Sequence, residues 1–356
     1  MDMGDQERLL RQRKRWMWGC TGGCLGLIVV VGLAIIGIYM WFARALPVPD
    51  AEVFLTPQTR AFLFVSIRRD DPMMVEVPVR LALRPDVGNR MPIKADQPEQ
   101  MREGVVYVAP IRLVVLGTAA AGEDGVRWGL AVSITRLGRL LDAVLRQVAA
   151  KKELPKPEPY RGGAIWPAPA GGAFAARTNI YMVAEDAILL RTWLDGIEAA
   201  VRPDDEPAAA PLPAGMDPQL LGAYDRLDRD SPVRFACLNT RGELAALLAR
   251  VPHPGVHAAL EAAGLAGPGV HAVSGQVRSL NSRDAALTLR VACDGAGTAA
   301  GIETALRNLA ADPACTPYLR EASVQGHDDH TVELTVRVEN FADRVAALLA
   351  TPKPQD

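Results

Sequence analysis

The stretch Thr331-Val-Glu-Leu-Thr-Val-Arg-Val338 decides the fold class. Its aliphatic residues alternate strictly with threonine, glutamate and arginine, so an extended chain places the apolar side chains on one face and the polar ones on the other. This pattern is typical of a strand in an antiparallel sheet that helices cover on a single face. After Asn340 the apolar spacing changes to that of a helix, with Val345 and Leu348, so we expect a helix to follow directly.

The same change from strand spacing to helix spacing recurs upstream. In each case an apolar run meets a small polar residue that is suited to cap a helix. The strands predicted in this way span residues 128–134, 179–184, 233–238 and 286–293. Residues 270–280 and 285–291 are predicted to pair as a hairpin across residues 281–284. The sequence therefore predicts the α+β class.

A proline-rich tract divides this α+β region. Residues 202–215 contain four prolines and no apolar periodicity, so we predict a linker at residues 202–219 between domains at 60–201 and 220–350, with a short tail at 351–356. The second domain reads as strand, helix, two strands, helix, strand and helix, which resembles a ferredoxin-like split β-α-β arrangement. The first domain is interpreted as a diverged copy of the second, so the expected architecture is a tandem.

An uncharged run precedes these domains. Residues 16–43 contain no charged side chain, and as a helix this run reaches about 42 Å, more than the hydrocarbon core of a bilayer at about 30 Å. Aromatic residues at both ends, such as Trp16 and Trp41, match the preference of these rings for the membrane interfaces. We therefore expect a single N-terminal transmembrane helix in contact with the lipid bilayer, followed by an extended stalk at residues 44–59.

The charges that flank the run predict its orientation. Basic residues are concentrated in residues 1–15, which are expected to remain in the cytoplasm, while the rest of the chain is exported. The run is longer than the apolar region of a cleaved signal peptide, which favours a signal-anchor over cleavage after Ala45. The arginine-rich, alanine-rich composition indicates a bacterial chain, so the expected localisation is a single-pass position in a bacterial inner membrane.

Glycines at the cytoplasmic end of the run suggest self-association. Gly19 and Gly23, and likewise Gly22 and Gly26, form G-x-x-x-G pairs that allow two membrane helices to approach closely. We interpret these four residues as helix-packing positions of a homodimer. The alternative is that glycine is simply common in membrane helices.

Residues that could carry chemistry are few. His327 and His330 flank two aspartates and could supply two ligands of a metal ion, but no further ligand with a recognisable spacing follows them. Their position after a glycine and before a strand favours a hairpin turn, so we predict neither a metal nor a cofactor. Ser274 lacks the sharp glycine-flanked turn of a serine nucleophile. The three cysteines of the predicted domains are expected to be buried thiols, with their disulfide status left open: Cys237, Cys293 and Cys315.

The composition argues against two classes of protein. A net charge of −2 and a pI near 6.3 argue against a basic nucleic-acid-binding protein, and 49% hydrophobic residues argue against disorder. We therefore expect a membrane-anchored envelope protein whose exported domains bind a partner protein, a lipid or a wall component without catalysis. Two alternatives remain: a tethered hydrolase whose site is assembled from distant residues, and an architectural oligomer formed through the glycine-rich span.

Overall fold

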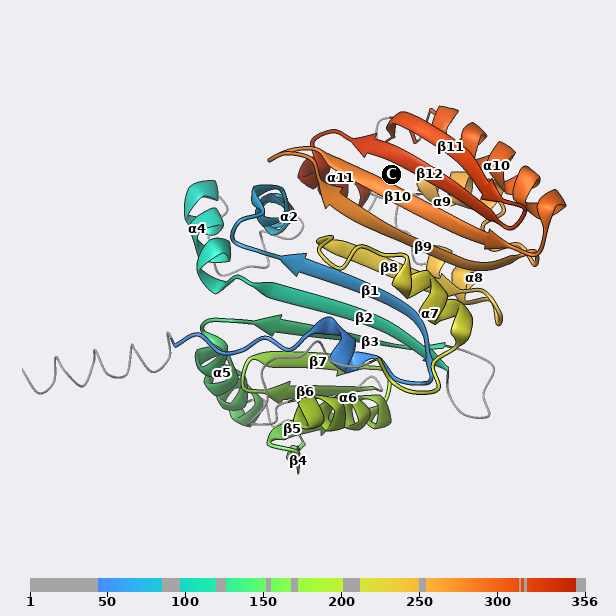
Figure 1. Cartoon of the computed structure of the whole chain (residues 1–356). Helices are drawn as coiled ribbons and strands as arrows, with labels where there is room; N and C mark the ends of the chain where they lie inside the picture. The colour runs from blue at the N-terminus through green and yellow to red at the C-terminus, as the bar shows by residue number, and fades with distance from the viewer. Residues whose placement is uncertain are drawn as a thin grey trace, which may run out of the picture. The chain divides into compact units, whose positions relative to one another are not determined.

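Figure 1 shows the structure, a computed structural model of the chain. Contacts divide the chain into two units, and the fold described below is that of the compact unit Leu46–Asp356. The residues that the structure describes are 44–84, 97–119, 126–151, 155–167, 172–200, 212–249, 254–313, 315–316 and 319–349.

The described strands form one twelve-stranded sheet in which all neighbouring strands run antiparallel. The order across the sheet is β11-β12-β10-β9-β8-β1-β2-β3-β7-β6-β5-β4. In chain order the strands are β1 (Thr59–Ile67), β2 (Ile111–Ala119), β3 (Val126–Ile134), β4 (Glu158–Tyr160), β5 (Gly163–Pro167), β6 (Ala173–Arg177), β7 (Ile180–Ala184), β8 (Val233–Leu238), β9 (Val270–Ser279), β10 (Ala285–Cys293), β11 (Arg320–Asp328) and β12 (Thr331–Val338).

Helices connect these strands. They are the 3-10 helix η1 (Ala51–Phe54) and the α-helices α2 (Pro72–Ala82), α4 (Pro98–Val108), α5 (Gly138–Lys151), α6 (Ala187–Ala200), α7 (Pro218–Asp225), α8 (Glu243–Leu248), α9 (Pro254–Ala262), α10 (Ala296–Ala311) and α11 (Phe341–Leu348).

Helices cover opposite faces of the sheet in its two halves. Along β8, Ala236 and Leu238 belong to one buried cluster and Cys237 to another, because successive side chains of a strand point to opposite faces. The first cluster contains side chains of η1, α6 and α7, which lie over the same face in Figure 1. The second contains side chains of α8, α9 and α10. The change of face occurs at β8 and β1, in the middle of the sheet.

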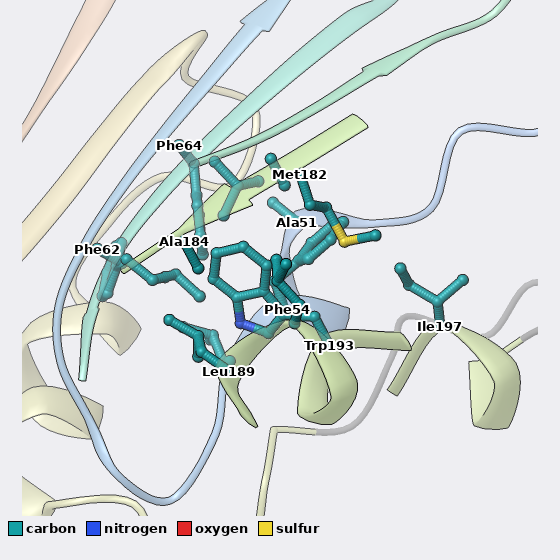
Figure 2. Close-up of a cluster of buried hydrophobic side chains, with 14 of the residues drawn as sticks. Ala51, Phe54, Phe62, Phe64, Met182, Ala184, Leu189, Trp193 and Ile197 are labelled. Atoms are coloured by element: carbon teal, nitrogen blue, oxygen red, sulfur yellow. The ribbon is translucent and has the colours of Figure 1, made fainter. Parts of the chain in front are cut away.

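Helix α6 forms the centre of the first cluster. The Asp186 carboxylate accepts a hydrogen bond from the Leu189 amide (2.7 Å) and so caps the start of the helix. Leu190, Trp193 and Ile197 then follow at helical spacing and are buried against the sheet. Figure 2 shows the Trp193 indole between the sheet and Phe54 of η1.

Strand β12 has the bounds that its alternation predicts. Its four aliphatic residues are buried in the second cluster, while Thr335 on the opposite face is exposed. The predicted hairpin of β9 and β10 is also confirmed, with Ala285 opposite Ser279. The helix after β12 forms as expected, but Asn340 makes no side-chain capping hydrogen bond to it.

The tandem, ferredoxin-like architecture is wrong. Strands β8 and β9, which α8 and α9 connect, are direct antiparallel neighbours, whereas a split β-α-β unit leaves room for another strand between two connected strands. Strand β1 of the first predicted domain also pairs with β8 of the second, from Ala61 opposite Cys237 to Val65 opposite Val233. Alternation predicts which face of a strand is buried and does not predict its neighbours, so the single large sheet was missed. Residues 202–211 of the predicted linker lie outside the described residues.

The prediction of a membrane anchor is also corrected. Among the residues that the structure describes, no helix is long and apolar enough to cross a membrane. The longest of them, α10, has 16 residues, and a span requires about 20. The predicted span, residues 16–43, lies outside the described residues, as do its helix-packing positions Gly19, Gly22, Gly23 and Gly26. The described residues therefore give no support to the transmembrane helix, the signal-anchor or the single-pass localisation.

Candidate functional site

A cavity in the described part of the chain lies against the middle of the sheet. Its volume is about 470 Å³. Its walls come from η1 and the residue before it, from β1 and β2, and from α7, β8 and the loop between them. The lining residues are Asp50, Ala51, Glu52, Phe64, Val65, Ser66, Arg68, Arg112, Leu212, Tyr224, Arg229, Ser231, Pro232 and Arg234.

One wall is the segment that enters the sheet before β1, residues 46–58, which includes much of the predicted stalk. Its backbone is held by hydrogen bonds from the Leu46 amide to the Thr135 carbonyl (2.8 Å) and from the Asn179 side-chain amide to the Pro47 carbonyl (3.0 Å). Arg112 of β2 donates to the Asp50 carboxylate (2.8 Å) and to the Pro49 carbonyl. This segment is therefore fixed to the sheet by polar contacts, and Phe54 anchors its far end in the core.

A nearly buried ion pair links this segment to β8. Arg234 donates to the Glu52 carboxylate (3.1 Å), and the side chains of these two residues are 11% and 14% exposed. The Tyr224 hydroxyl of α7 donates to the same carboxylate oxygen (2.7 Å). The Arg234 guanidinium also lies 5.4 Å from the centre of the Phe64 ring, close enough for a cation–π interaction.

These contacts shift two pKa values. Burial raises the pKa of Glu52, but the Tyr224 hydrogen bond and the Arg234 charge outweigh burial, so the pKa of Glu52 lies below its ordinary value of 4.5. Burial and the hydrogen bond to Glu52 raise the pKa of Tyr224 to about 12. At neutral pH Glu52 is therefore a carboxylate and Tyr224 a neutral phenol.

Two further polar side chains line the cavity and take no part in the contacts of Glu52. The Arg229 guanidinium lies 5.8 Å from the centre of the Tyr224 ring, and within the described residues it has no carboxylate partner. Ser231 is 4% exposed, and its hydroxyl oxygen is buried without a hydrogen-bond partner in the described part of the chain. Both residues are in or next to the loop that enters β8.

A second hollow, of about 360 Å³, adjoins the cavity and shares Arg68 and Pro232 with it. Asp71 in this hollow accepts hydrogen bonds from the Met74 amide (3.1 Å) and from the Ser279 hydroxyl (2.7 Å). Asp71 thus caps α2 and ties it to β9. We assign no binding role to this hollow.

The residues singled out in the sequence lie elsewhere. His327 is at the end of the edge strand β11, where its Nε2 lies 3.4 Å from a Glu333 carboxylate oxygen, and His330 is in the following turn. Among the described residues no group of three or more histidine, cysteine or acidic side chains could hold a metal ion. The structure therefore does not bring these two histidines together with further ligands.

The serine and cysteine candidates are buried in the sheet and its core. Ser274 lies on β9 and is buried. The cysteines 237, 293 and 315 are free and buried, and burial raises the pKa of the Cys237 thiol to about 12. A thiol of that pKa is protonated at neutral pH and is a poor nucleophile.

Sequence reasoning missed every residue of the cavity. Glu52 and Arg234 are far apart in the chain and belong to no motif, and they meet only because β1 and β8 are neighbours in the sheet. The one local signal is the loop before β8, where Arg229 and Ser231 stand among aspartates in a segment without apolar periodicity.

Comparison with known proteins adds no further assignment. No family model, curated protein or solved structure matches this chain. The cavity must therefore be interpreted from its own geometry and charge.

Proposed function

We propose that the protein is a non-catalytic binding module whose ligand is a small molecule held in the cavity between η1, β1, β2 and β8. The observation that carries this proposal is the convergence of charged and polar side chains from distant parts of the chain on one cavity of about 470 Å³. Cavities of about 300–1,000 Å³ with a few placed polar groups are typical of small-molecule sites.

The partners of the polar side chains in the cavity favour ligand binding over hydrolysis. A serine nucleophile needs a base within hydrogen-bond distance, but the Ser231 hydroxyl has no partner among the described residues. The carboxylates of Asp50 and Glu52, which could act as bases, are each engaged by an arginine. The lining residues include no histidine, lysine or cysteine. This supports a site that holds its ligand without converting it.

We expect the full-length protein to be stabilised by members of a library of small polar organic molecules and to leave them chemically unchanged. A ligand at one hundred times its dissociation constant stabilises the folded state by about 2.7 kcal/mol, which is readily seen as a rise in the unfolding temperature. Each stabilising compound is then incubated with the protein and analysed by mass spectrometry. Conversion of such a compound at a rate that scales with protein concentration would show that the protein is an enzyme. The absence of stabilisation by any member would contradict ligand binding.

A further inference from the structure

We infer that the ligand of this cavity is a small organic anion, whose carboxylate or phosphoryl group contacts Arg229 and Ser231. This inference rests on the proposed function, since it names the class of ligand for the same cavity.

The balance of charge in the cavity is the first observation. Four arginines line it against two carboxylates. Asp50 is paired with Arg112 (2.8 Å) and Glu52 with Arg234 (3.1 Å), so both carboxylates are already neutralised. The surplus charge belongs to the two remaining arginines and is positive.

These two arginines are poorly satisfied within the protein. The Arg68 guanidinium lies 3.8 Å from a carboxylate oxygen of Asp230, whose side chain is 91% exposed. Such exposed pairs are weak and leave the arginine available to another anion. Arg229 forms no ion pair with the described residues, and its guanidinium lies 5.8 Å from the centre of the Tyr224 ring. A guanidinium group presents paired N–H donors that match the oxygens of a carboxylate or a phosphate.

Ser231 is the second, independent observation. Its hydroxyl group is buried at the cavity wall without a hydrogen-bond partner among the described residues. A buried polar group without a partner destabilises the folded protein, so such groups call for an explanation. An oxyanion in the cavity would accept the hydroxyl proton in a hydrogen bond and remove this cost.

The size and the remaining walls indicate that the anion has an organic body. The cavity is much larger than a single inorganic ion requires, and Val65, Leu212 and Pro232 add apolar surface to it. A cationic ligand would face the surplus positive charge without a free carboxylate to pair with. A neutral ligand would leave Arg229 without a counter-ion. An organic anion satisfies both the charge and the volume.

The test uses four probes that share a phenyl ring and differ in the group attached to it: benzoate, phenyl phosphate, benzamide and benzamidine. They present a carboxylate, a phosphoryl group, a neutral amide and a cation. In calorimetric titrations of the full-length protein we expect one-to-one binding of benzoate or phenyl phosphate that is at least tenfold tighter than that of benzamide or benzamidine. The tighter of the two anions identifies which oxyanion the site prefers.

Substitutions test whether the anion binds at Arg229 and Ser231. Arg229→Gln is expected to weaken binding of the preferred anion at least tenfold, and Ser231→Ala several-fold. Arg307→Gln is the matched control, because Arg307 is an exposed arginine of α10 that does not line the cavity, and its substitution should leave the affinity unchanged. Thermal unfolding of each variant shows that the fold is retained.

Two results would overturn the inference, and they separate it from the proposed function. If benzamide binds as tightly as the anions and Arg229→Gln has no effect, the cavity binds ligands but not by their charge. If neither anion binds saturably, the inference fails, and the wider library of small molecules decides the proposed function on its own.

Discussion

Replacing Trp193 by alanine is expected to lower the free energy of unfolding by about 3–5 kcal/mol, the range for removal of a large aromatic side chain from a core. Trp193 is 0% exposed, and its ring packs edge-on against Phe54 with the centroids 5.7 Å apart. Gly129 of β3 makes room for it, since a Cβ there would lie only 2.5 Å from the indole. The surrounding strands cannot close the resulting void without moving the sheet, so the full cavity cost applies.

Among the described residues the Trp193 indole is held by apolar packing and makes no hydrogen bond. Its Nε1 has no hydrogen-bond partner there, so the loss is one of apolar contact and not of a polar bond. Ile188 on the same helix is the matched control, because it is 67% exposed and its replacement by alanine should change stability by at most about 0.5 kcal/mol. Urea unfolding of both variants measures the difference. A Trp193→Ala variant as stable as Ile188→Ala would show that α6 does not pack on the sheet as described.

The second large effect is expected at the ion pair in the cavity wall. Replacing Glu52 by glutamine should cost about 3 kcal/mol at neutral pH, since it leaves Arg234 in a nearly buried position without its counter-ion. The matched control is Glu158→Gln, which removes the partner of Arg191 from a pair whose side chains are 50% and 40% exposed. That exposed pair is expected to contribute about 0–1 kcal/mol.

The effect of Glu52→Gln should depend on pH. Because the pKa of Glu52 is lowered in the folded protein, its contribution to stability is complete above the ordinary pKa of 4.5 and is lost as the pH falls through the folded value. Tyr224 shows the opposite pH dependence, because its pKa is raised to about 12 in the folded protein. Its contribution to stability is complete below the ordinary pKa of 10 and is lost as the pH rises toward 12. Urea unfolding in neutral and in strongly acidic buffer should show the difference between wild type and Glu52→Gln shrinking in acid. An equal difference in both buffers would contradict the assigned ion pair.

Half of the strands of the described sheet could be predicted from the sequence: β3, β7, β8, β9, β10 and β12. Strands β8 and β12 have the predicted bounds because a half-buried strand imposes period-2 spacing on its own residues. Strand β11 was missed for the same reason, since nearly all of its residues are exposed and no alternation is imposed on Arg320–Asp328. Strands β1 and β2 were also not predicted, although both bury several residues, so period-2 spacing identifies only some of the half-buried strands.

The order of the strands and the site could not be predicted in this way. The pairing of β1 with β8 joins segments that are far apart in the chain, and no local pattern specifies such a neighbour. The cavity depends on that pairing, because it brings Glu52 to Arg234 and places both near Ser231. The spacing of His327 and His330 instead suggested a metal site, but these residues lie in an exposed strand end and turn.

Hydrogen exchange of the full-length protein, followed by mass spectrometry, tests whether the cavity binds the anion. The exchange is compared with and without saturating phenyl phosphate or benzoate, whichever binds more tightly. If the cavity is the binding site, the anion should slow exchange in peptides that cover residues 60–70 and 226–236. Exchange in peptides from α10, which does not line the cavity, should be unchanged. Slower exchange confined to peptides outside the cavity walls, such as those of β11 and β12, would contradict the account.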